Sequence, residues 1–195
     1  MIKVGLTGGI GSGKTIVGKL FVMNGIPVFS ADDEAKILLD FNPVIMEKLT
    51  SVFGSDIYLQ NHTIDRKKFA SLIFNNESLL QKANEIIHPE VRKCFIEWCS
   101  QQDAPFVIYE AAILFESGHS IDMDYNILVV ADESVRIKRV MDRNQFTEEQ
   151  VRQRIDKQWH DKRKIELADF VIKNNNEELI IPQVIEIIEK IKTHG

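Results

Sequence analysis

The residues most able to do chemistry lie near the start of the chain, in Gly8-Gly9-Ile10-Gly11-Ser12-Gly13-Lys14-Thr15. This stretch fits the pattern G-x-x-x-x-G-K-[ST] of a phosphate-binding loop. Its glycines let backbone amides curl around phosphate oxygens, and a following helix adds positive potential at its N-terminus. The lysine of such a loop reaches the β- and γ-phosphates, and its hydroxyl residue binds Mg²⁺. The stretch therefore predicts binding of a magnesium nucleotide.

The flanks of the loop support this interpretation. The apolar run Ile2 to Leu6 indicates a buried strand that enters the loop, and Lys14 to Met23 indicates a helix that follows it. The alternative is a glycine-rich strand-to-helix turn that binds no ligand. After a helix end near Asn24-Gly25, Ile26 to Ser30 predicts a second short strand, so the connection is expected to be a right-handed parallel crossover.

Composition favours one α/β unit with insertions. The chain has 195 residues, a formal net charge of −5 and a pI of about 5.6, which favours neither nucleic acid nor an anionic membrane as a partner. Cys94 and Cys99 fit neither a C-x-x-C motif nor a disulfide framework, so buried thiols of a reducing compartment are expected. No signal peptide or long apolar run is evident, and we expect a soluble cytoplasmic protein.

Carboxylates follow two of the expected strands, at the edge where open α/β sheets place their ligands. Asp32 and Asp33 come after the second strand, and both could instead complement the dipole of a helix from Glu34 to Leu39. We favour that structural role for Asp33 and leave Asp32 open at this point. Glu110 ends the apolar run from Phe106, where nucleotide-binding proteins of this class usually place an Asp beside the metal.

Between these strands the pattern changes to consecutive helices. Phe41 to about Cys99 carries apolar residues at helical spacing, which predicts a helical subdomain inserted over one side of the site. Arg66, His88 and Arg92 are its candidate ligands. The alternative is that both arginines are solvated and that His88 ends a helix before Pro89.

The remaining segments complete the sheet. Asn126 to Ala131 predicts a buried strand, and Asp132 is expected to cap the helix after it. Ala168 to Ile172 predicts the last strand, before a terminal amphipathic helix from Pro182 to Lys192. The apolar segment Ala111 to Gly118 either lines a pocket or belongs to the core.

The span Arg136 to Lys164 reverses the charge of the chain. It holds ten Lys or Arg against five Asp or Glu, a local balance of +5. Thr147 to Gln150 resembles a capping box, and the helix after it shows only a thin apolar stripe of Val151, Ile155 and Trp159. Such a helix is expected to attach loosely, as a lid over nucleotide would; a solvated charged helix is the alternative.

In this order, the stretches resemble the dephospho-CoA kinase family almost end to end. The similar stretches are Leu6 to Thr15, Ala31-Asp32, Ile87-His88-Pro89, Leu114-Phe115-Glu116 and Ala168 to Asn174. The phosphate loop alone is widely shared, but the full set is specific to this family. The resemblance implies an α/β P-loop kinase with a five-stranded parallel sheet. Its core would be residues 1–40, 100–135 and 165–195, its inserted helical CoA-binding domain 41–99, and its helical lid 136–164.

The resemblance also implies an activity. The family transfers the γ-phosphate of ATP to the ribose 3′-hydroxyl of dephospho-CoA, the last step of coenzyme A synthesis, so ATP and Mg²⁺ are the expected cofactors. A monomer or weak homo-oligomer is expected. Two rivals are another small-molecule kinase, such as a nucleoside monophosphate kinase, and a nucleotide-binding switch. A GTPase switch would need a guanine-specifying Asn-Lys-x-Asp, which the sequence lacks.

Site residues carry over from the family position by position. Asp32 is implied as general base, with Lys14 and the lid residue Arg139 as further catalytic groups. Ser30 stands where the family has the first Asp of Asp-Ala-Asp, and Glu110-Ala111-Ala112 stands where it more often has Asp-x-Pro. The implied ATP-binding residues are Gly9, Gly11, Ser12, Gly13, Lys14, Thr15, Ile16, Arg143 and Asn174, the last at adenine. The implied substrate residues are Asp32, Arg66, His88, Arg92, Leu114, Phe115 and Glu116, and the implied metal residues are Thr15, Asp32 and Glu110.

Overall fold

The computed structural model describes residues 1–74 and 76–194, and the chain divides into two compact units. The sheet unit consists of Met1–Ser30 and Gln102–Gly195, and the helical unit of Ala31–Gln101. The helical unit begins earlier than the boundary expected after residue 40. The reason is that α2 (Ala31–Phe41) packs on α5 (Glu77–Ser100) and on α3 (Pro43–Phe53).

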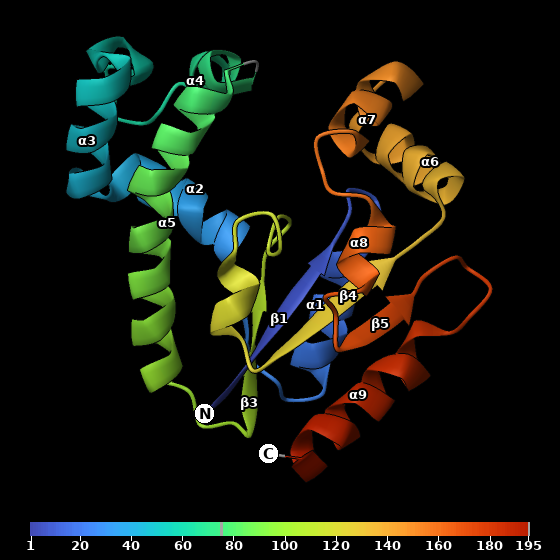
Figure 1. Ribbon diagram of the computed structural model, residues 1–195. Coiled ribbons are helices and arrows are strands. Elements are labelled where there is room, and N and C mark those ends of the chain that lie inside the picture. Colours follow the sequence, from blue (N-terminus) through green and yellow to red (C-terminus); the bar gives the residue numbers. More distant parts are fainter. Residues whose placement is uncertain (75, 195) are drawn as a thin grey trace. The chain divides into compact units, whose positions relative to one another are not determined.

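The sheet unit is built on five parallel strands, as the sequence predicts (Figure 1). They are β1 (Ile2–Gly8), β2 (Val28–Ser30), β3 (Phe106–Glu110), β4 (Tyr125–Val130) and β5 (Phe170–Lys173). Their order is β2-β3-β1-β4-β5, so the chain first runs from β1 to one side of the sheet, to β2 and β3, and then crosses to the other side of β1, to β4 and β5. A ligand site is expected where such a reversal occurs, beyond the carboxyl end of β1.

The core follows from the alternation of side chains along β1. Val4 and Leu6 are fully buried on one face, under α1 (Lys14–Met23) and α9 (Ile180–His194), whose apolar residues include Val17, Phe21 and Ile188. On the other face a Cβ at Gly5 would overlap Leu114 and Asn126, because the loop after β3 lies directly on the strand. Glycine is therefore needed at this position for close packing.

The charged span contains α6 (Glu133–Asn144), α7 (Glu148–Ile155) and α8 (Asp161–Ile165), and η2 (His119–Asp122) precedes β4. The expected capping box is confirmed, since Gln150 N donates to Thr147 Oγ1 at 3.3 Å and Thr147 N to Gln150 Oε1 at 3.0 Å. Two local expectations are wrong. Trp159 lies beyond the end of α7. Asp132 occupies the N-cap position of α6, but its side chain makes no capping hydrogen bond and accepts from Asn175 Nδ2 at 3.1 Å.

Helices α6 and α7 share a small hydrophobic core of their own. Val151 and Val140 are buried in it together with Ile137. Ile10 from the glycine-rich loop packs against this cluster, as do Met141, Phe146 and Ile155. The second helix is therefore fixed by more than the thin stripe seen in sequence.

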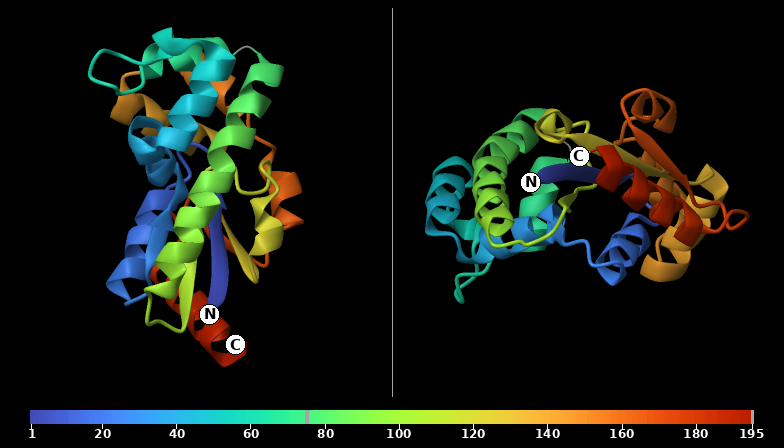
Figure 2. Two further views of the ribbon diagram at one scale, coloured as in Figure 1. Left: turned by 90° about the vertical axis from the view of Figure 1, so that its left-hand side faces the viewer. Right: turned by 90° about the horizontal axis from the view of Figure 1, so that it is seen from below.

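The helical unit arranges α2, α3 and α4 (Arg66–Phe74) around α5, with η1 (Ser55–Ile57) between α3 and α4 (Figure 2). Helix α5 continues through Pro89, so the alternative of a helix end at His88 is wrong. Cys94 and Cys99 are half-buried, not fully buried as expected, and burial with the nearby Glu34 carboxylate raises the pKa of the Cys94 thiol. Among the described residues, no helix is long and apolar enough to span a bilayer.

Candidate active site

The glycine-rich loop runs from the end of β1 at Gly8 to the first residue of α1 at Lys14. Gly11 and Gly13 have φ of 80° and 96°, in the left-handed region that favours glycine. Within the loop Ser12 N donates to Gly9 O at 2.9 Å, and Ile16 N donates to Gly13 O at 2.9 Å. The backbone therefore adopts a compact turn directly before a helix N-terminus, as a phosphate-binding loop does.

Glu110 lies beside the functional end of the loop. It is paired in register with Leu6 of β1, and its Oε1 accepts from Thr15 Oγ1 at 3.2 Å. The Lys14 ammonium nitrogen is 3.7 Å from the same oxygen, and the two side chains are only 12% and 11% exposed. A hydroxyl and a carboxylate oxygen are the hard donors that Mg²⁺ prefers, so these residues fit the implied metal.

Room for the longer carboxylate comes from Gly18. This residue lies on α1, and a Cβ there would come within 3.1 Å of Glu110 Oε2. At position 110 this sequence has Glu where the family that it resembles more often has Asp. The structure accommodates the extra methylene because position 18 has no side chain. No cluster of three or more His, Cys, Asp or Glu able to hold a metal occurs among the described residues.

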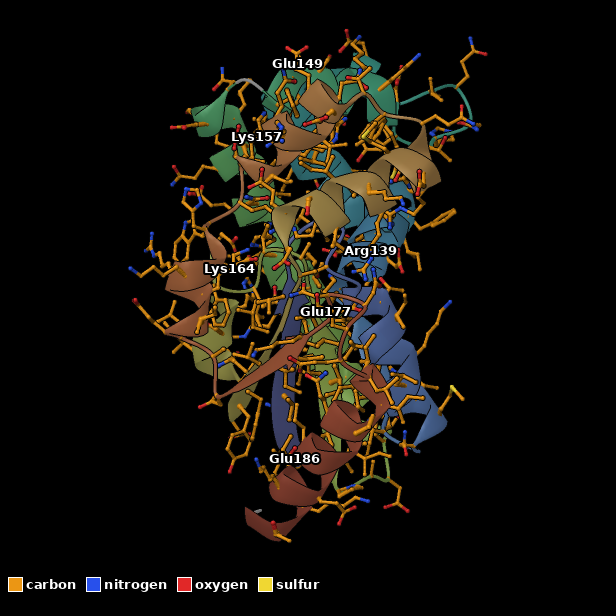
Figure 3. The ribbon with its side chains drawn as sticks, turned by 90° about the vertical axis from the view of Figure 1, so that its right-hand side faces the viewer. Arg139, Glu149, Lys157, Lys164, Glu177 and Glu186 are labelled. Carbon is orange, nitrogen blue, oxygen red and sulfur yellow. The ribbon has the colours of Figure 1, made fainter. Side chains whose placement is uncertain are left out.

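Arg139 and Asn174 meet next to Gly13. Asn174 is buried and donates from Nδ2 to Ser12 O at 2.7 Å. Arg139 reaches from α6 toward the same place (Figure 3) and donates from Nη2 to Asn174 O at 2.9 Å and to Asn176 Oδ1 at 2.6 Å. Its Nη1 is 3.4 Å from the carbonyl oxygens of Gly11 and Ser12. The guanidinium thus holds the loop and the segment after β5, and its expected action on the phosphoryl group stays a prediction.

The other residues that are expected to bind the nucleotide differ in their burial and contacts. Ser12 is buried and its Oγ has no hydrogen-bond partner among the residues that the structure describes, while Gly9 lies against Arg136. Ile16 is exposed on α1, and Arg143 is exposed with Nε donating to its neighbour Asn144 at 2.7 Å.

The loop after β3 contains three of the expected substrate residues, and their side chains contact other parts of the protein. Leu114 and Phe115 are buried, so this apolar segment is core at these two positions. Glu116 Oε1 accepts from Trp159 N at 3.1 Å and lies 2.8 Å from the ammonium of Lys164, which is fully buried on α8. A buried ion pair of this kind strongly penalises removal of one partner, so it fixes the segment after α7 to the loop after β3.

The helical unit carries the remaining candidates. Asp32 is exposed in the first turn of α2, which follows Ser30 of β2 directly, and Asp33 pairs with Lys36 at 2.6 Å. His88 and Arg92 lie one turn apart on one face of α5. Arg66 is bound instead within the unit: its Nη2 donates to Asp40 Oδ2 at 2.5 Å and to Lys36 O at 3.1 Å.

Two residues near the loop escaped the sequence analysis as site residues. Arg136 is 5% exposed and donates from Nε to Ile10 O at 2.9 Å, and Gln158 Oε1 accepts from Ile10 N at 2.8 Å. Arg136 does carry a signal in sequence, because it lies one turn before Val140 on the apolar side of α6. Gln158 follows α7 and has no such local signal.

The loop, its position at the switch point of a parallel sheet, and the carboxylate beside its hydroxyl residue define a P-loop kinase class of fold and site. A family model described as dephospho-CoA kinase matches residues 2–179. A dephospho-CoA kinase of Porphyromonas gingivalis is 41% identical over 194 residues, covering 99% of this chain and 96% of that protein. The chain belongs to the dephospho-CoA kinase family.

Solved structures agree with this assignment. TT1252 from Thermus thermophilus superposes with a TM-score of 0.85 at 30% identity, covering 99% of this chain and 97% of that chain. A dephospho-CoA kinase from Campylobacter jejuni gives a TM-score of 0.70 at 26% identity, covering 98% of both chains. The expectations of a P-loop kinase fold and of this family are therefore confirmed.

Proposed function

We propose that this chain transfers the γ-phosphate of ATP to the ribose 3′-hydroxyl of dephospho-CoA, giving coenzyme A and ADP. The observation that carries the proposal is the cluster of Lys14, Thr15 and Glu110 at the end of the phosphate loop, in a member of this family. Lys14 supplies positive charge where the β- and γ-phosphates would bind. Thr15 and Glu110 are the residues that would hold Mg²⁺, which when bound neutralises charge on the phosphates.

The proposed mechanism depends mainly on positioning and charge. Phosphoryl transfer spreads negative charge over the γ-oxygens, so groups that are already oriented and poorly hydrated contribute most. Lys14 meets this requirement, because its side chain is largely buried next to the carboxylate of Glu110. We assign Asp32 to orient the acceptor hydroxyl and to take its proton, a role that depends on its geometry relative to that hydroxyl.

The helical unit is proposed to bind the acceptor. His88 and Arg92 on one face of α5 offer a ring and a cation that suit the phosphate groups of dephospho-CoA. Arg143 and Arg139 are proposed to act from the lid. We further expect a cytoplasmic monomer or weak homo-oligomer, and sedimentation with and without nucleotide tests the oligomeric state.

The test is a coupled ADP-release assay with purified protein against dephospho-CoA, nucleoside monophosphates and a water-only blank, followed by mass and NMR analysis of the product. ADP release that depends on dephospho-CoA, with phosphate on the 3′-oxygen, supports the proposal. Turnover of a nucleoside monophosphate without turnover of dephospho-CoA would contradict it. Nucleotide binding without transfer to any acceptor would favour the regulatory rival.

A further inference from the structure

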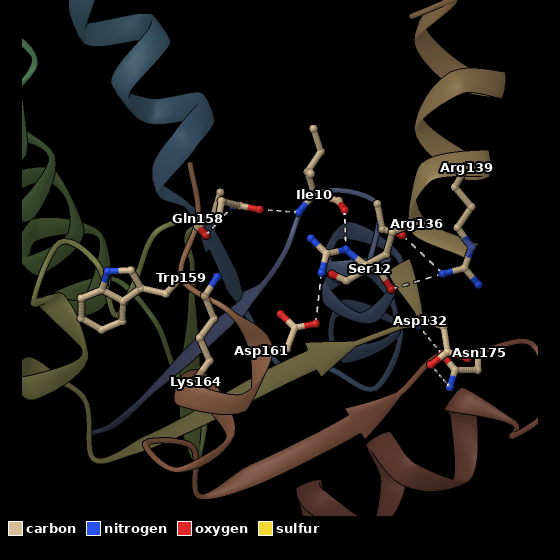
Figure 4. Close-up of polar contacts among 12 residues, drawn as sticks. Ile10, Ser12, Asp132, Arg136, Arg139, Gln158, Trp159, Asp161, Lys164 and Asn175 are labelled. Carbon is tan, nitrogen blue, oxygen red and sulfur yellow. Dashed lines mark hydrogen bonds and ion pairs between the residues drawn. The ribbon is translucent and has the colours of Figure 1, made fainter. Parts of the chain in front are cut away.

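The peptide groups around Ile10 are held from both sides by residues of the charged span (Figure 4). The Ile10 amide donates to Gln158 Oε1 at 2.8 Å, and the Ile10 carbonyl accepts from Arg136 Nε at 2.9 Å. These two groups belong to successive peptide units, Gly9–Ile10 and Ile10–Gly11. Both peptide planes at the tip of the phosphate loop are therefore fixed by side chains from outside the loop.

The carbonyl bond also fixes the next amide. In a trans peptide the C=O and the N–H of one unit point in opposite directions, and the described residues contain no cis bond. When Arg136 holds the Ile10 carbonyl, the Gly11 N–H must point away from Arg136. Backbone amides of this loop are the groups that bind phosphate oxygens, so the orientation of one of them depends on a side chain of α6.

Arg136 is well anchored for this task. Its Nη1 donates to Asp161 Oδ2 at 3.1 Å, and the side chain is only 7% exposed. A Cβ at Gly9 would overlap its guanidinium, and a Cβ at Gly11 would lie 2.6 Å from its carbonyl oxygen. The planar fork thus joins α8 to the loop, and charge-assisted bonds of this kind are stronger than neutral ones. Glycines at 9 and 11 are required for this close approach.

Gln158 makes the second connection. Its Oε1 accepts from the Ile10 amide, and its Nε2 lies 3.4 Å from Ala112 O in the loop after β3. Ile10 itself packs into the hydrophobic cluster of α6 and α7. Movement of this span therefore cannot leave the tip of the phosphate loop unchanged.

We propose that Arg136 and Gln158 are positioning residues that orient the Ile10 peptides, and that they couple nucleotide affinity to the conformation of the charged span. The inference deepens the proposed function, but its main readout is nucleotide binding without an acceptor. Loss of either bond lets a peptide plane rotate, so the loop must be ordered again at each binding event. Nucleotide affinity falls while the acceptor site is unaffected.

The central variant is Arg136→Lys, which keeps a charge but cannot bond Ile10 O and Asp161 together. We expect its affinity for ADP and ATP, measured by calorimetry, to fall about tenfold, the size expected for a lost bond to a charged donor. Its KM for ATP should rise by a similar factor, with KM for dephospho-CoA unchanged. Hydrogen exchange in a peptide spanning residues 9–14 should become faster.

Three further variants separate the coupling from general damage. Gln158→Glu keeps an acceptor for Ile10 N but loses the donor to Ala112, so its affinity should fall less than that of Gln158→Leu. Arg152→Lys is the matched control, since Arg152 is exposed on α7 and pairs with Glu133 and Glu148. It should leave nucleotide affinity unchanged.

The result that overturns the proposal is normal nucleotide affinity and normal loop exchange in Arg136→Lys and Gln158→Leu, with or without a lower melting temperature. If Arg136→Lys fails to fold, the ordering of Gln158→Leu and Gln158→Glu decides the question alone. If the wild-type chain binds ATP but does not phosphorylate dephospho-CoA, the proposed function fails while the affinity comparison still stands.

Discussion

The two units of the molecule use their cationic side chains differently. In the sheet unit Arg136 and Lys164 are buried, and Arg136 and Arg139 donate to backbone carbonyl oxygens. In the helical unit the cations stay at the surface in pairs such as Lys36 with Asp33, Arg66 with Asp40 and Lys68 with Asp56. Surface pairs contribute about 0–1 kcal/mol, whereas breaking a buried pair costs several times more.

This contrast indicates a division of work. The buried Arg136 and the partly buried Arg139 of the sheet unit hold the main chain of the phosphate loop, so replacing them should change nucleotide affinity or turnover. Cations of the helical unit are hydrated and can exchange partners at low cost, which would suit the diphosphate of the proposed acceptor. Variants in the two units should therefore fail in different kinetic parameters.

The largest effect is expected for Lys14→Ala. It removes the charge next to the β- and γ-phosphates, and kcat should fall by roughly 10³-fold or more. Lys19→Ala is the control, since Lys19 is exposed on the same helix and should keep normal turnover. Steady-state ADP release measures both. A near-normal kcat in Lys14→Ala would contradict the proposed role of the phosphate loop in catalysis.

Arg139→Ala should be the next most damaging change. If the guanidinium leaves Asn174 and acts on the phosphoryl group, kcat falls by on the order of 10²-fold or more, and Arg139→Lys stays poor because it lacks the planar fork. If it only holds Gly11, Ser12 and Asn174, KM for ATP rises and kcat is kept. Arg152→Ala should change kcat little. A larger fall of kcat in Arg152→Ala than in Arg139→Ala would contradict the role assigned to Arg139.

Arg92→Ala tests the acceptor role of the helical unit. We expect KM for dephospho-CoA to rise about tenfold, the equivalent of one charge-assisted bond, while KM for ATP stays the same. Lys93→Ala is the neighbouring control, since its side chain is exposed and its ammonium lies 2.8 Å from Oε1 of Glu90 on the same helix. Equal changes in both KM values would make Arg92 a structural residue.

The smallest effect is expected for Arg66→Ala. Its side chain is 49% exposed and its partner Asp40 lies on α2 of the same unit, so the free energy of unfolding should fall by only about 0–1 kcal/mol. Chemical denaturation measures this change. A substantial rise in KM for dephospho-CoA would support the predicted place of Arg66 in the substrate site and weaken the contrast between the units.

Sequence patterns predicted those features whose cause is local. The phosphate loop, the five parallel strands and the capping box at Thr147 depend on residues within a few positions of one another. The arginine bond to Ile10 O joins residues 126 positions apart, and the glutamine bond to Ile10 N joins residues 148 apart. The place of Arg136 on the apolar side of α6 indicates its burial, but no periodicity or motif indicates which backbone group either side chain binds, so both contacts were missed.

Side-chain direction was the other limit. Asp132 was expected to cap α6, yet Asn175 from the segment after β5 offers its carboxylate a partner. Arg139 was expected to face the phosphoryl group, and that prediction stays open because the loop carbonyls and two asparagines now surround its guanidinium. In both cases the helix was predictable, but the competing hydrogen-bond partners lay on another element.

Gly18 lowers the stability of its helix but leaves room for the carboxylate of the candidate site. Glycine within a helix is less stable than alanine by roughly 0.5–1 kcal/mol, and α1 accepts that cost at the turn that faces Glu110. Adding one methyl group there would strengthen the helix and press on the carboxylate beside Thr15. A screen that rewards heat resistance alone would therefore favour a change that harms the site, and positions 18 and 110 must be varied as a pair.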